Sequence, residues 1–355
     1  MAAGGAQAAT TPGVQGAAPV VGPGDARRVA ITGAAGFIGS HLTDRLLALG
    51  HAVCGIDDLS HGSLDNLARQ QDNPAFTFHR LDVRDRDGLL RATRECDLFV
   101  HLAALKIPRY GNALATLQVN QQGAANVLEL AAGGRRKVVL ASTSDVYGLS
   151  ERLPFAEDDP LVLGPPSVRR WAYAVSKLHD EQLAFAYAEE RGLPVVPLRF
   201  FGTYGPRHHL SWWGGPQSVF LTCCLQGRPL PIHGDGLQTR SFTFIDDLVT
   251  GIVAALFAPA ADGQVINLGA TEEVTIRELA RQVHQACGGV GEPALELVPY
   301  DSFTGKRYDD VRRRVPCVAR ARRLLGWQAQ VGLAAGLART LPWHRDRLAQ
   351  EARDG

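Results

Sequence analysis

Tyr173 and Lys177 stand four residues apart in the stretch RRWAYAVSK, where a predicted amphipathic helix begins. Four residues make about one helical turn, so the phenol and the ammonium group lie on the same face of the helix. A phenol has an ordinary pKa near about 10, and a nearby ammonium group favours the phenolate and lowers that pKa. The two residues are therefore either a proton-transfer pair, with Tyr173 as the base, or an ordinary surface pair.

Thr143, Ser144 and Asp145 follow a predicted strand in the stretch LASTSDVYG. Ligands of a parallel sheet bind outside the carboxyl ends of its strands, which places Thr143 opposite the helix that carries Tyr173. Thr143 and Tyr173 can then bind the same substrate oxygen, and Tyr173 can take its proton while a hydride leaves the carbon. Asp145 is either an acid–base group beside them or a loop carboxylate that caps local backbone.

Three glycines, Gly33, Gly36 and Gly39, form the pattern GxxGxxG between a predicted strand and a predicted helix. The first glycine permits a tight turn, the second lets the backbone approach a pyrophosphate, and the third lets the helix pack on the strand. The helix begins near Phe37 and Ile38, and its N-terminal amides favour phosphate. The pattern predicts a dinucleotide site; the alternative is a doubly wound fold that binds no nucleotide.

Two carboxylates, Asp57 and Asp58, end the second predicted strand. A carboxylate at this place accepts hydrogen bonds from the ribose hydroxyls of adenosine and repels a 2′-phosphate. No arginine follows before Arg69. We therefore expect the cofactor to be NAD rather than NADP.

Short apolar strands alternate with helical patterns up to about residue 202. This alternation predicts right-handed crossovers and an α/β Rossmann fold, a doubly wound parallel sheet with helices on both faces. Beyond it, Gly- and Pro-rich pieces and late helices predict a smaller C-terminal substrate-binding lobe. The predicted helices span residues 61–71, 86–95, 112–133, 171–191, 246–257, 275–287, 317–326 and 333–350.

The same pattern divides the chain into segments. Residues 1–25 are rich in Ala, Gly, Pro, Gln and Thr and have no Lys or Arg, which indicates a disordered tail rather than a signal peptide. We expect an NAD-binding domain over 26–202, to which about 241–270 return. The substrate-binding lobe is expected over 203–240 and 271–350.

Charge and cysteine usage narrow the possible functions. Lys and Arg number 37 against 36 Asp and Glu, so a general nucleic-acid or membrane-surface binder is not expected. The sequence has no apolar run long enough to span a membrane. The six cysteines lack CxxC or other metal-type spacing, and the histidines have no evident partners, so we expect free thiols in a cytoplasmic protein and no metal.

Several motifs resemble those of extended short-chain dehydrogenases/reductases of the nucleotide-sugar epimerase/dehydratase family. They occur in order over about residues 28–327 and read TGAAGFIG, HLAALK, STSDVYG, YAVSK, RFFGTYGPR, PIHGDGLQTRSFTFIDD and YDDVRRRVPCVARARRLLGW. The resemblance implies a bound, recycled NAD, a nucleoside-diphosphate sugar as substrate, and a homodimer formed through the helices near 112–133 and 171–191.

The resemblance also implies roles for individual residues. Lys177 would tune Tyr173 electrostatically and anchor the ribose of NAD. Arg207 and Arg240 would reach the diphosphate side of the substrate, and Ser144 would touch the substrate. Further cofactor contacts would come from Asp82, Val83, Leu102, Ala103, Ala104 and Lys106.

Two positions need separate comment. Gly202 departs from the family's pattern, and Arg314 can be interpreted in two ways. Gly202 of RFFG stands where family members often carry an Asn that touches the substrate. Arg314 matches an arginine found near the substrate carboxylate in decarboxylases of the family, and an arginine suits a carboxylate. With Arg312 and Arg313 beside it, Arg314 is equally well a part of a solvated basic run.

The resemblance leaves three reactions open, and each of them begins with oxidation at C4 of the sugar. The acid in Thr143-Ser144-Asp145 favours decarboxylation of a UDP-hexuronate such as UDP-glucuronate. A UDP-sugar 4-epimerase, of the UDP-glucose or UDP-glucuronate type, is the next alternative, followed by a 4,6-dehydratase. The enzyme would be a lyase or isomerase with internal oxidation and reduction. A catalytically silent NAD-binding scaffold is the non-enzymatic alternative, although binding alone needs no base such as Tyr173.

The first testable prediction concerns the cofactor. Because Asp57 is expected to meet the ribose hydroxyls and to repel a 2′-phosphate, cofactor-free protein should bind NAD more tightly than NADP. Calorimetric titration with each dinucleotide measures this preference. Tighter binding of NADP would contradict the role of Asp57.

Overall fold

The computed structural model describes residues 25–106, 112–300 and 310–354. Its centre is a seven-stranded sheet in the order β11-β6-β5-β4-β1-β2-β3, in which all neighbours are parallel. These strands are β1 (Arg28–Thr32), β2 (Ala52–Asp57), β3 (Phe76–Arg80), β4 (Leu98–His101), β5 (Val138–Thr143), β6 (Val195–Phe200) and β11 (Ile266–Leu268). The predicted Rossmann sheet is confirmed, and its strand order reverses between β1 and β4, where such sheets bind ligands.

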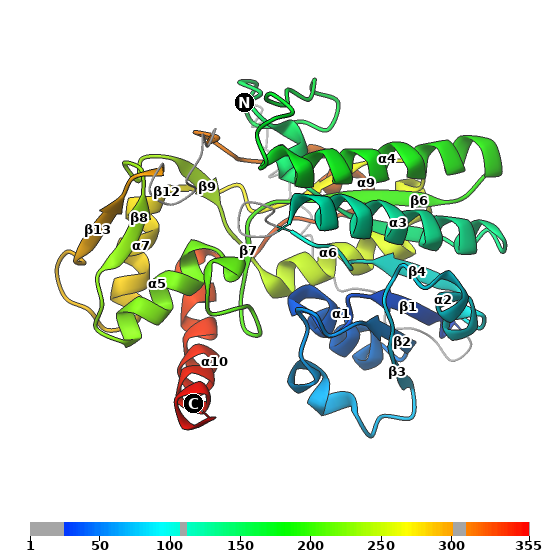
Figure 1. The fold of residues 1–355 in the computed structure, drawn as a ribbon, viewed down its shortest axis with the longest axis horizontal. Helices are drawn as coiled ribbons and strands as arrows, with labels where there is room; N and C mark the ends of the chain where they lie inside the picture. Colours follow the sequence, from blue (N-terminus) through cyan, green and yellow to red (C-terminus); the bar gives the residue numbers. More distant parts are fainter. Residues whose placement is uncertain (1–24, 107–111, 301–309, 355) are drawn as a thin grey trace, which may run out of the picture.

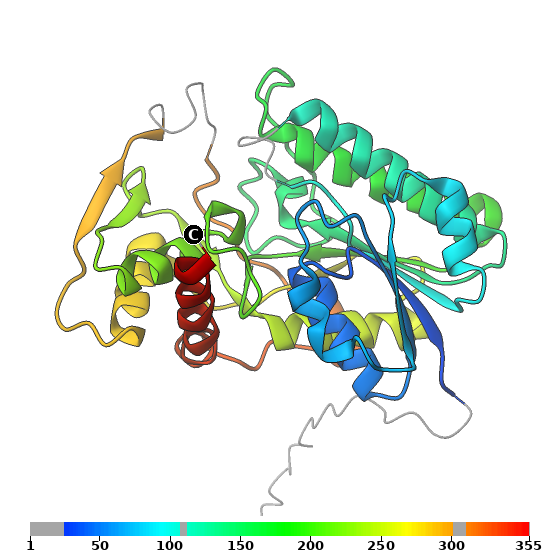
Figure 2. The same ribbon diagram turned by 60° about the horizontal axis from the view of Figure 1, so that its bottom comes forward.

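Helices cover both faces of this sheet (Figures 1 and 2). The long helices α3 and α4 pack side by side on one face, and α1 and α6 pack together on the other. The helices around the sheet are α1 (Phe37–Ala48), α2 (Arg86–Thr93), α3 (Ala113–Ala132), α4 (Trp171–Arg191), α6 (Ile245–Phe257) and α9 (Ala319–Leu325).

Alternating strand residues fill two separate cores. Val29 and Ile31 of β1 belong to the core shared with α1 and α6, whereas Ala30 between them joins the core under α3 and α4. On β5, Val139 faces the first core, and Val138 faces the second. Both faces of a central parallel strand are apolar because both are covered by helices.

A smaller lobe lies beside the sheet, on the left of Figure 1. Its short strands pair as β12 with β9 in antiparallel fashion and as β13 with β8 in parallel. Its elements are α5 (Pro216–Leu225), β8 (Leu230–His233), β9 (Thr239–Ser241), β12 (Glu273–Thr275), α7 (Ile276–Ala286), β13 (Leu295–Val298) and α10 (Leu333–Asp354). The lobe is joined to the sheet domain by the β7–β10 pair, Thr203–Tyr204 with Thr243–Phe244. The domain boundaries given from the sequence stay a proposal.

The predicted helices agree with the structure within a few residues, with one exception. The segment expected to be helical over 61–71 is a 3₁₀ helix, η1 (Leu64–Gln70). Of its two leucines only Leu67 is buried, and Leu64 is 43% exposed. A segment with so little apolar surface to bury gains little from a longer α-helix. The remaining 3₁₀ helices are η2 (Ser144–Tyr147), η3 (Trp212–Gly214) and η4 (Pro259–Ala261).

Two predictions concern the tail and the membrane. The predicted tail, apart from Asp25, lies outside the described residues. Across the part of the chain that the structure describes, none of the helices combines the length and the apolar character that crossing a bilayer requires.

A buried ion pair joins α4 to the sheet. The guanidinium group of Arg199 on β6 donates twice to Glu181 on α4, from Nε at 2.9 Å and from Nη2 at 2.8 Å. The hydroxyl of Ser142 on β5 donates to the same carboxylate at 2.5 Å. Both charged side chains are at most 5% exposed. These contacts therefore hold the helix of Tyr173 against the strand that ends in Thr143.

We expect Arg199→Met to lower the free energy of unfolding by about 3–5 kcal/mol, because it leaves the Glu181 carboxylate buried without its counter-charge. Urea denaturation of the purified protein measures this loss. Arg80→Met, which removes an exposed arginine from β3, is the matched control and should cost little. A loss for Arg199→Met no greater than for the control would show that the ion pair does not hold α4.

Candidate active site

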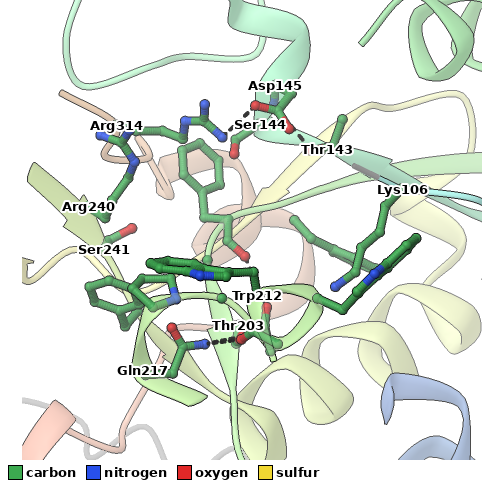
Figure 3. A pocket seen from close by; sticks show the side chains of 18 of the residues that line it. Lys106, Thr143, Ser144, Asp145, Thr203, Trp212, Gln217, Arg240, Ser241 and Arg314 are labelled. Atoms are coloured by element: carbon green, nitrogen blue, oxygen red, sulfur yellow. Dashed lines mark hydrogen bonds and ion pairs between the residues drawn. The ribbon is translucent and has the colours of Figure 1, made fainter. Parts of the chain in front are cut away.

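A cavity of about 410 Å³ opens at the carboxyl ends of β5 and β6, between the sheet and the smaller lobe (Figure 3). It brings together several of the residues predicted from sequence. Those that line it are Phe37, Ile38, Lys106, Thr143, Ser144, Asp145, Tyr173, Arg240 and Arg314. The cavity therefore joins the predicted cofactor loop to the predicted chemistry and to arginines of the second lobe.

The surroundings of Tyr173 raise the pKa of its phenol in this structure. Burial raises its pKa above the ordinary value, and the carboxylates of Asp145 and Asp180 raise it further. Lys177 is 1% exposed, and its Nζ lies 3.3 Å from Oδ2 of Asp180 in an ion pair. The tuning of Tyr173 by Lys177 stays a prediction, because the shift in the pKa of Tyr173 comes from burial and from the carboxylates of Asp145 and Asp180.

The glycine loop has the shape that a pyrophosphate needs. Gly33 has φ +74°, and a Cβ there would lie 2.9 Å from the amide nitrogen of Ala103, so a side chain does not fit. At Gly39 a Cβ would lie only 2.0 Å from the carbonyl oxygen of Gly33, because α1 packs directly on the turn. Gly36 precedes α1 as its N-cap, so the free amides of the first helical turn follow it.

Asp57 is placed at the edge of this loop. Its carboxylate accepts hydrogen bonds from the amide of Ala35 at 3.0 Å and from the amide of Leu59 at 2.9 Å. Burial raises its pKa, although these two amides and His61 oppose the shift. The neighbouring Asp58 instead accepts from Ser60 and is exposed. Asp57 therefore both shapes the loop and fits the predicted ribose contact.

The other predicted cofactor residues surround the ends of β3 and β4. Asp82 is paired with Arg84, which lowers the pKa of the carboxyl group. The Thr32 hydroxyl accepts from the amide of Ala103 at 3.3 Å. Val83 is buried, and the segment of Leu102 and Ala104 follows β4 directly. The residues present thus fit an NAD molecule along the carboxyl edge of β1, β2 and β4.

Lys106 reaches the cavity because the preceding residue is fixed to α3. The buried Asn120 accepts from the amide of Leu105 at 2.8 Å and donates to its carbonyl oxygen at 3.1 Å. The same Asn120 donates to the hydroxyl of Ser176 on α4 at 3.0 Å. One amide side chain therefore fixes the strand end beside Lys106 and the helix of Tyr173 together.

Asp145 points to arginines rather than to solvent. Its Oδ1 lies 2.7 Å from Nη1 of Arg314 and 3.6 Å from Nη2 of Arg170. Figure 3 shows Asp145 and Arg314 directed toward each other across the top of the cavity. The Thr143 hydroxyl caps the local backbone, because it accepts from the amide of Asp145.

Arg314 is likewise separated from its basic neighbours. Its side chain is 14% exposed, whereas those of Arg312 and Arg313 are 72% and 56% exposed. The latter two pair with Asp235 and Glu273 on the outside of the second lobe. Arg314 is therefore not part of a solvated basic run.

Asp310 forms the second half of this charged cluster. It lies 3.0 Å from Nη2 of Arg240 and 3.8 Å from Nη1 of Arg170, and it accepts from the Tyr300 hydroxyl at 2.6 Å. Burial raises its pKa, but the three arginines and Tyr300 outweigh burial and lower it. Sequence reasoning missed Arg170, Asp310 and Tyr300. The available signal for Arg170 was its position three residues before Tyr173, which is about one helical turn.

Arg207 is a predicted substrate residue that the structure does not bring to this cavity. It has φ +65°, and its Nη2 lies 2.7 Å from Oδ2 of Asp44 on α1. It lines a second hollow, beside α10. A diphosphate contact from Arg207 would require the side chain to leave Asp44.

Gly202 has a steric reason for lacking a side chain. A Cβ at this position would lie 2.7 Å from the carbonyl oxygen of Ser241, because the amide of Thr243 donates to the carbonyl oxygen of Gly202 at 2.7 Å. An Asn at this position would therefore collide with this strand. Among the described residues, the buried Ser241 hydroxyl has no hydrogen-bond partner, and Ser241 lines the cavity at the same place.

The stretch HHLSWWGG is packed on both lobes. Trp212 stacks on His233 of β8 with ring centroids 4.3 Å apart, and Trp213 stacks on His61 at 4.4 Å. His208 stacks on Phe37 at 4.1 Å. Trp212 and Trp213 also line the cavity, so the packed corner is at the same time one of its walls. Within the described ranges 25–106, 112–300 and 310–354, no group of three or more His, Cys, Asp or Glu could hold a metal ion.

Comparison with known proteins agrees with this geometry. Residues 29–269 match the model of the NAD dependent epimerase/dehydratase family. The chain belongs to this family. It is an NAD-dependent enzyme, and the glycine loop and Asp57 are the parts of the fold that fit this cofactor.

The curated relatives carry out different reactions. The UDP-N-acetyl-alpha-D-glucosaminuronate decarboxylase of Bacillus cytotoxicus is 33% identical over 90% of this chain and 98% of its own length. UDP-glucuronic acid decarboxylase 1 of Xenopus tropicalis is 36% identical, over 92% and 74%. The UDP-glucose 4-epimerase of Mycolicibacterium smegmatis is 37% identical, over 90% and 99%. Identity alone thus does not separate decarboxylase from epimerase.

A solved structure adds a third reaction to this comparison. The dTDP-glucose 4,6-dehydratase of Streptomyces venezuelae, solved with NAD bound, superposes with a TM-score of 0.81 at 31% identity, covering 91% of this chain and 98% of that one. Enzymes that catalyse different reactions therefore share this fold and this cofactor. The reaction of this chain has to be argued from the side chains of the cavity.

We expect Tyr173→Phe to lower turnover by about a hundredfold or more, because it removes only the positioned acid–base hydroxyl and keeps the ring. Steady-state assays of product formation measure the loss, and bound NAD should be retained. Tyr187→Phe removes a hydroxyl from the same helix outside the cavity and serves as the matched control. Near-normal turnover of Tyr173→Phe would mean that another group is the base.

Proposed function

We propose that the protein decarboxylates a UDP-linked hexuronate, of the UDP-glucuronate type, through a 4-keto intermediate. The observation that carries this proposal is the contact between Asp145 and Arg314 beside Thr143, at 2.7 Å. Hydride removal and return at C4 need neither a carboxylate nor an arginine at that place. A substrate that carries a carboxylate at C6, one carbon from C5, gives both groups a role.

The reaction begins and ends at the C4 hydroxyl. Thr143 and Tyr173 bind this oxygen, and Tyr173 takes its proton as C4 is oxidised, for which the phenol must first be ionised to the phenolate. NAD, when bound beside C4, would supply the acceptor for the hydride that leaves C4 and the donor that restores it. The 4-keto group makes the C6 carboxylate that of a β-keto acid, so carbon dioxide can leave. Loss of carbon dioxide leaves an enolate, and Asp145, after taking up a proton from solvent, delivers it to C5. Tyr173 returns its proton to the C4 oxygen as the hydride returns to C4.

The charges of the cavity favour an anionic sugar. Three guanidinium groups, from Arg170, Arg240 and Arg314, meet two carboxylates, from Asp145 and Asp310. Positive charge exceeds negative charge by one within this described cluster. The cluster is partly buried, so its attraction for a carboxylate is stronger than that of the same charges in water. A neutral hexose offers no group to match it.

A UDP-sugar 4-epimerase is the second candidate, because the relative of that name from Mycolicibacterium smegmatis is 37% identical to this chain. It would share Thr143, Tyr173 and the cofactor with the first candidate. It gives no role to the contact between Asp145 and Arg314, and we rank it second for that reason.

The assembly and the location belong to the same proposal. Leu114 on α3 and Val175 on α4 are 61% and 42% exposed, which suits a homodimer formed through these two helices. All six cysteines are free thiols, which suits the reducing cytoplasm.

Mass spectrometry of the purified enzyme with UDP-glucuronate, UDP-glucose and dTDP-glucose separates the candidate reactions. Loss of carbon dioxide from UDP-glucuronate is the expected result. No change of mass with formation of the 4-epimer, or loss of water, would replace the proposal by epimerisation or by dehydration.

Asp145→Asn tests the role of the acid after C4 oxidation. The variant keeps the size and hydrogen bonding of the side chain but loses its charge and basicity. We expect it to form NADH from bound NAD when UDP-glucuronate is added and to release little product, so that the reduced-nicotinamide absorbance rises and persists. Stopped-flow absorbance and product analysis measure both effects. Full activity of this variant would favour the epimerase.

A further inference from the structure

Arg170 is held at a place where it faces two carboxylates at long range. It is the residue before α4, and its side chain is 9% exposed. Its guanidinium group lies over the ring of Trp171, 4.8 Å from the centroid, which sets its direction. The ion-pair distances to Asp145 and Asp310, 3.6 Å and 3.8 Å, are longer than the about 2.7–2.9 Å of a charge-assisted hydrogen bond.

The other two arginines of the cluster differ in how firmly they are held. Arg240 donates to the backbone carbonyl oxygens of Thr239 and Val311, both at 2.7 Å, as well as to Asp310. Arg314 pairs with Asp145, but its Nε is buried and has no hydrogen-bond partner among the described residues. Arg314 therefore has a donor left for a ligand, whereas Arg240 is fixed to the second lobe.

We propose that Arg170 and Arg314 form a carboxylate-exchange site, in which the C6 carboxylate of a nucleotide hexuronate replaces Asp145 between the two guanidinium groups. This proposal rests on the proposed function, since it concerns how that substrate is selected. Arg170 and Arg314 both approach Oδ1 of Asp145, so a second carboxylate of the same shape can take this position. Asp310 is the positioning residue that keeps Arg170 beside it.

The exchange has two consequences for selectivity. A hexuronate brings its own carboxylate to the place of Asp145 beside Arg314 and Arg170, whereas a neutral hexose in the same place would bring no carboxylate to replace the one that Arg314 pairs with. The displaced carboxylate stays near the reacting carbons, because residue 145 directly follows Thr143 and Ser144. Binding of the correct substrate therefore also places Asp145 for the C5 proton.

Binding measurements on NAD-loaded protein test this site. All variants are made in the Tyr173→Phe background, so that the ligands are not consumed, and titrated with UDP-glucuronate and UDP-xylose, which differ by the C6 carboxylate. Arg170→Met should weaken UDP-glucuronate binding about tenfold or more and change UDP-xylose binding less than about twofold. Arg169→Met, which removes the exposed neighbouring arginine, should leave both unchanged.

Asp145→Asn gives the result that separates exchange from simple attraction. Because it removes the internal competitor, it should tighten UDP-glucuronate binding several-fold and leave UDP-xylose binding unchanged. Combining Arg170→Met with Asp145→Asn should reduce this gain in affinity for UDP-glucuronate.

Unchanged or weaker UDP-glucuronate binding by Asp145→Asn would overturn the exchange. Equal losses for both ligands in Arg170→Met would make Arg170 a nucleotide-binding or structural residue. Failure of the proposed function would show separately. The variants would then bind the two ligands as described, but the wild-type protein would release no carbon dioxide from UDP-glucuronate.

Discussion

The buried pair of Glu181 and Arg199 is the constraint on which the arrangement of the catalytic groups depends. It joins α4 to β6, and Ser142 adds β5 to the same carboxylate. Because Ser142 directly precedes Thr143, and Glu181 lies two turns after Tyr173, this one carboxylate sets the spacing of both reacting groups. A buried charge that is fully hydrogen-bonded tolerates few other geometries.

A second network of charges defines the side of the cavity that faces the sugar. It connects β5 through Asp145, α4 through Arg170, and the second lobe through Arg240, Asp310 and Arg314. The cofactor side is built mostly from backbone and glycine, and the sugar side from charged side chains. Relatives with one fold differ in reaction, so in this chain the reaction has to be argued from the charged side of the cavity rather than from the fold.

Electrostatics in the cavity also show why spacing alone was an incomplete guide. The four-residue spacing of Tyr173 and Lys177 put both on one helix, but it did not include the carboxylate of Asp180 beside the ammonium group. Burial raises the pKa of the Tyr173 phenol, and the carboxylates of Asp145 and Asp180 raise it further. Local spacing describes which side chains are near in sequence, while the pKa depends on every charge nearby in space.

The sequence by itself determined the order of strands and helices, the glycine turn, Asp57 at the end of β2, and the catalytic helix, because these features depend on contacts between near neighbours in the chain. It also determined the family, through motifs in a fixed order. The tertiary structure decided that Arg314 faces inward while Arg312 and Arg313 face outward, that Arg207 pairs with Asp44, and that Gly202 has no room for a side chain. Only the tertiary structure placed Arg170 between Asp145 and Asp310. These three residues lie on separate segments of the chain, which come together where the second lobe packs beside the sheet.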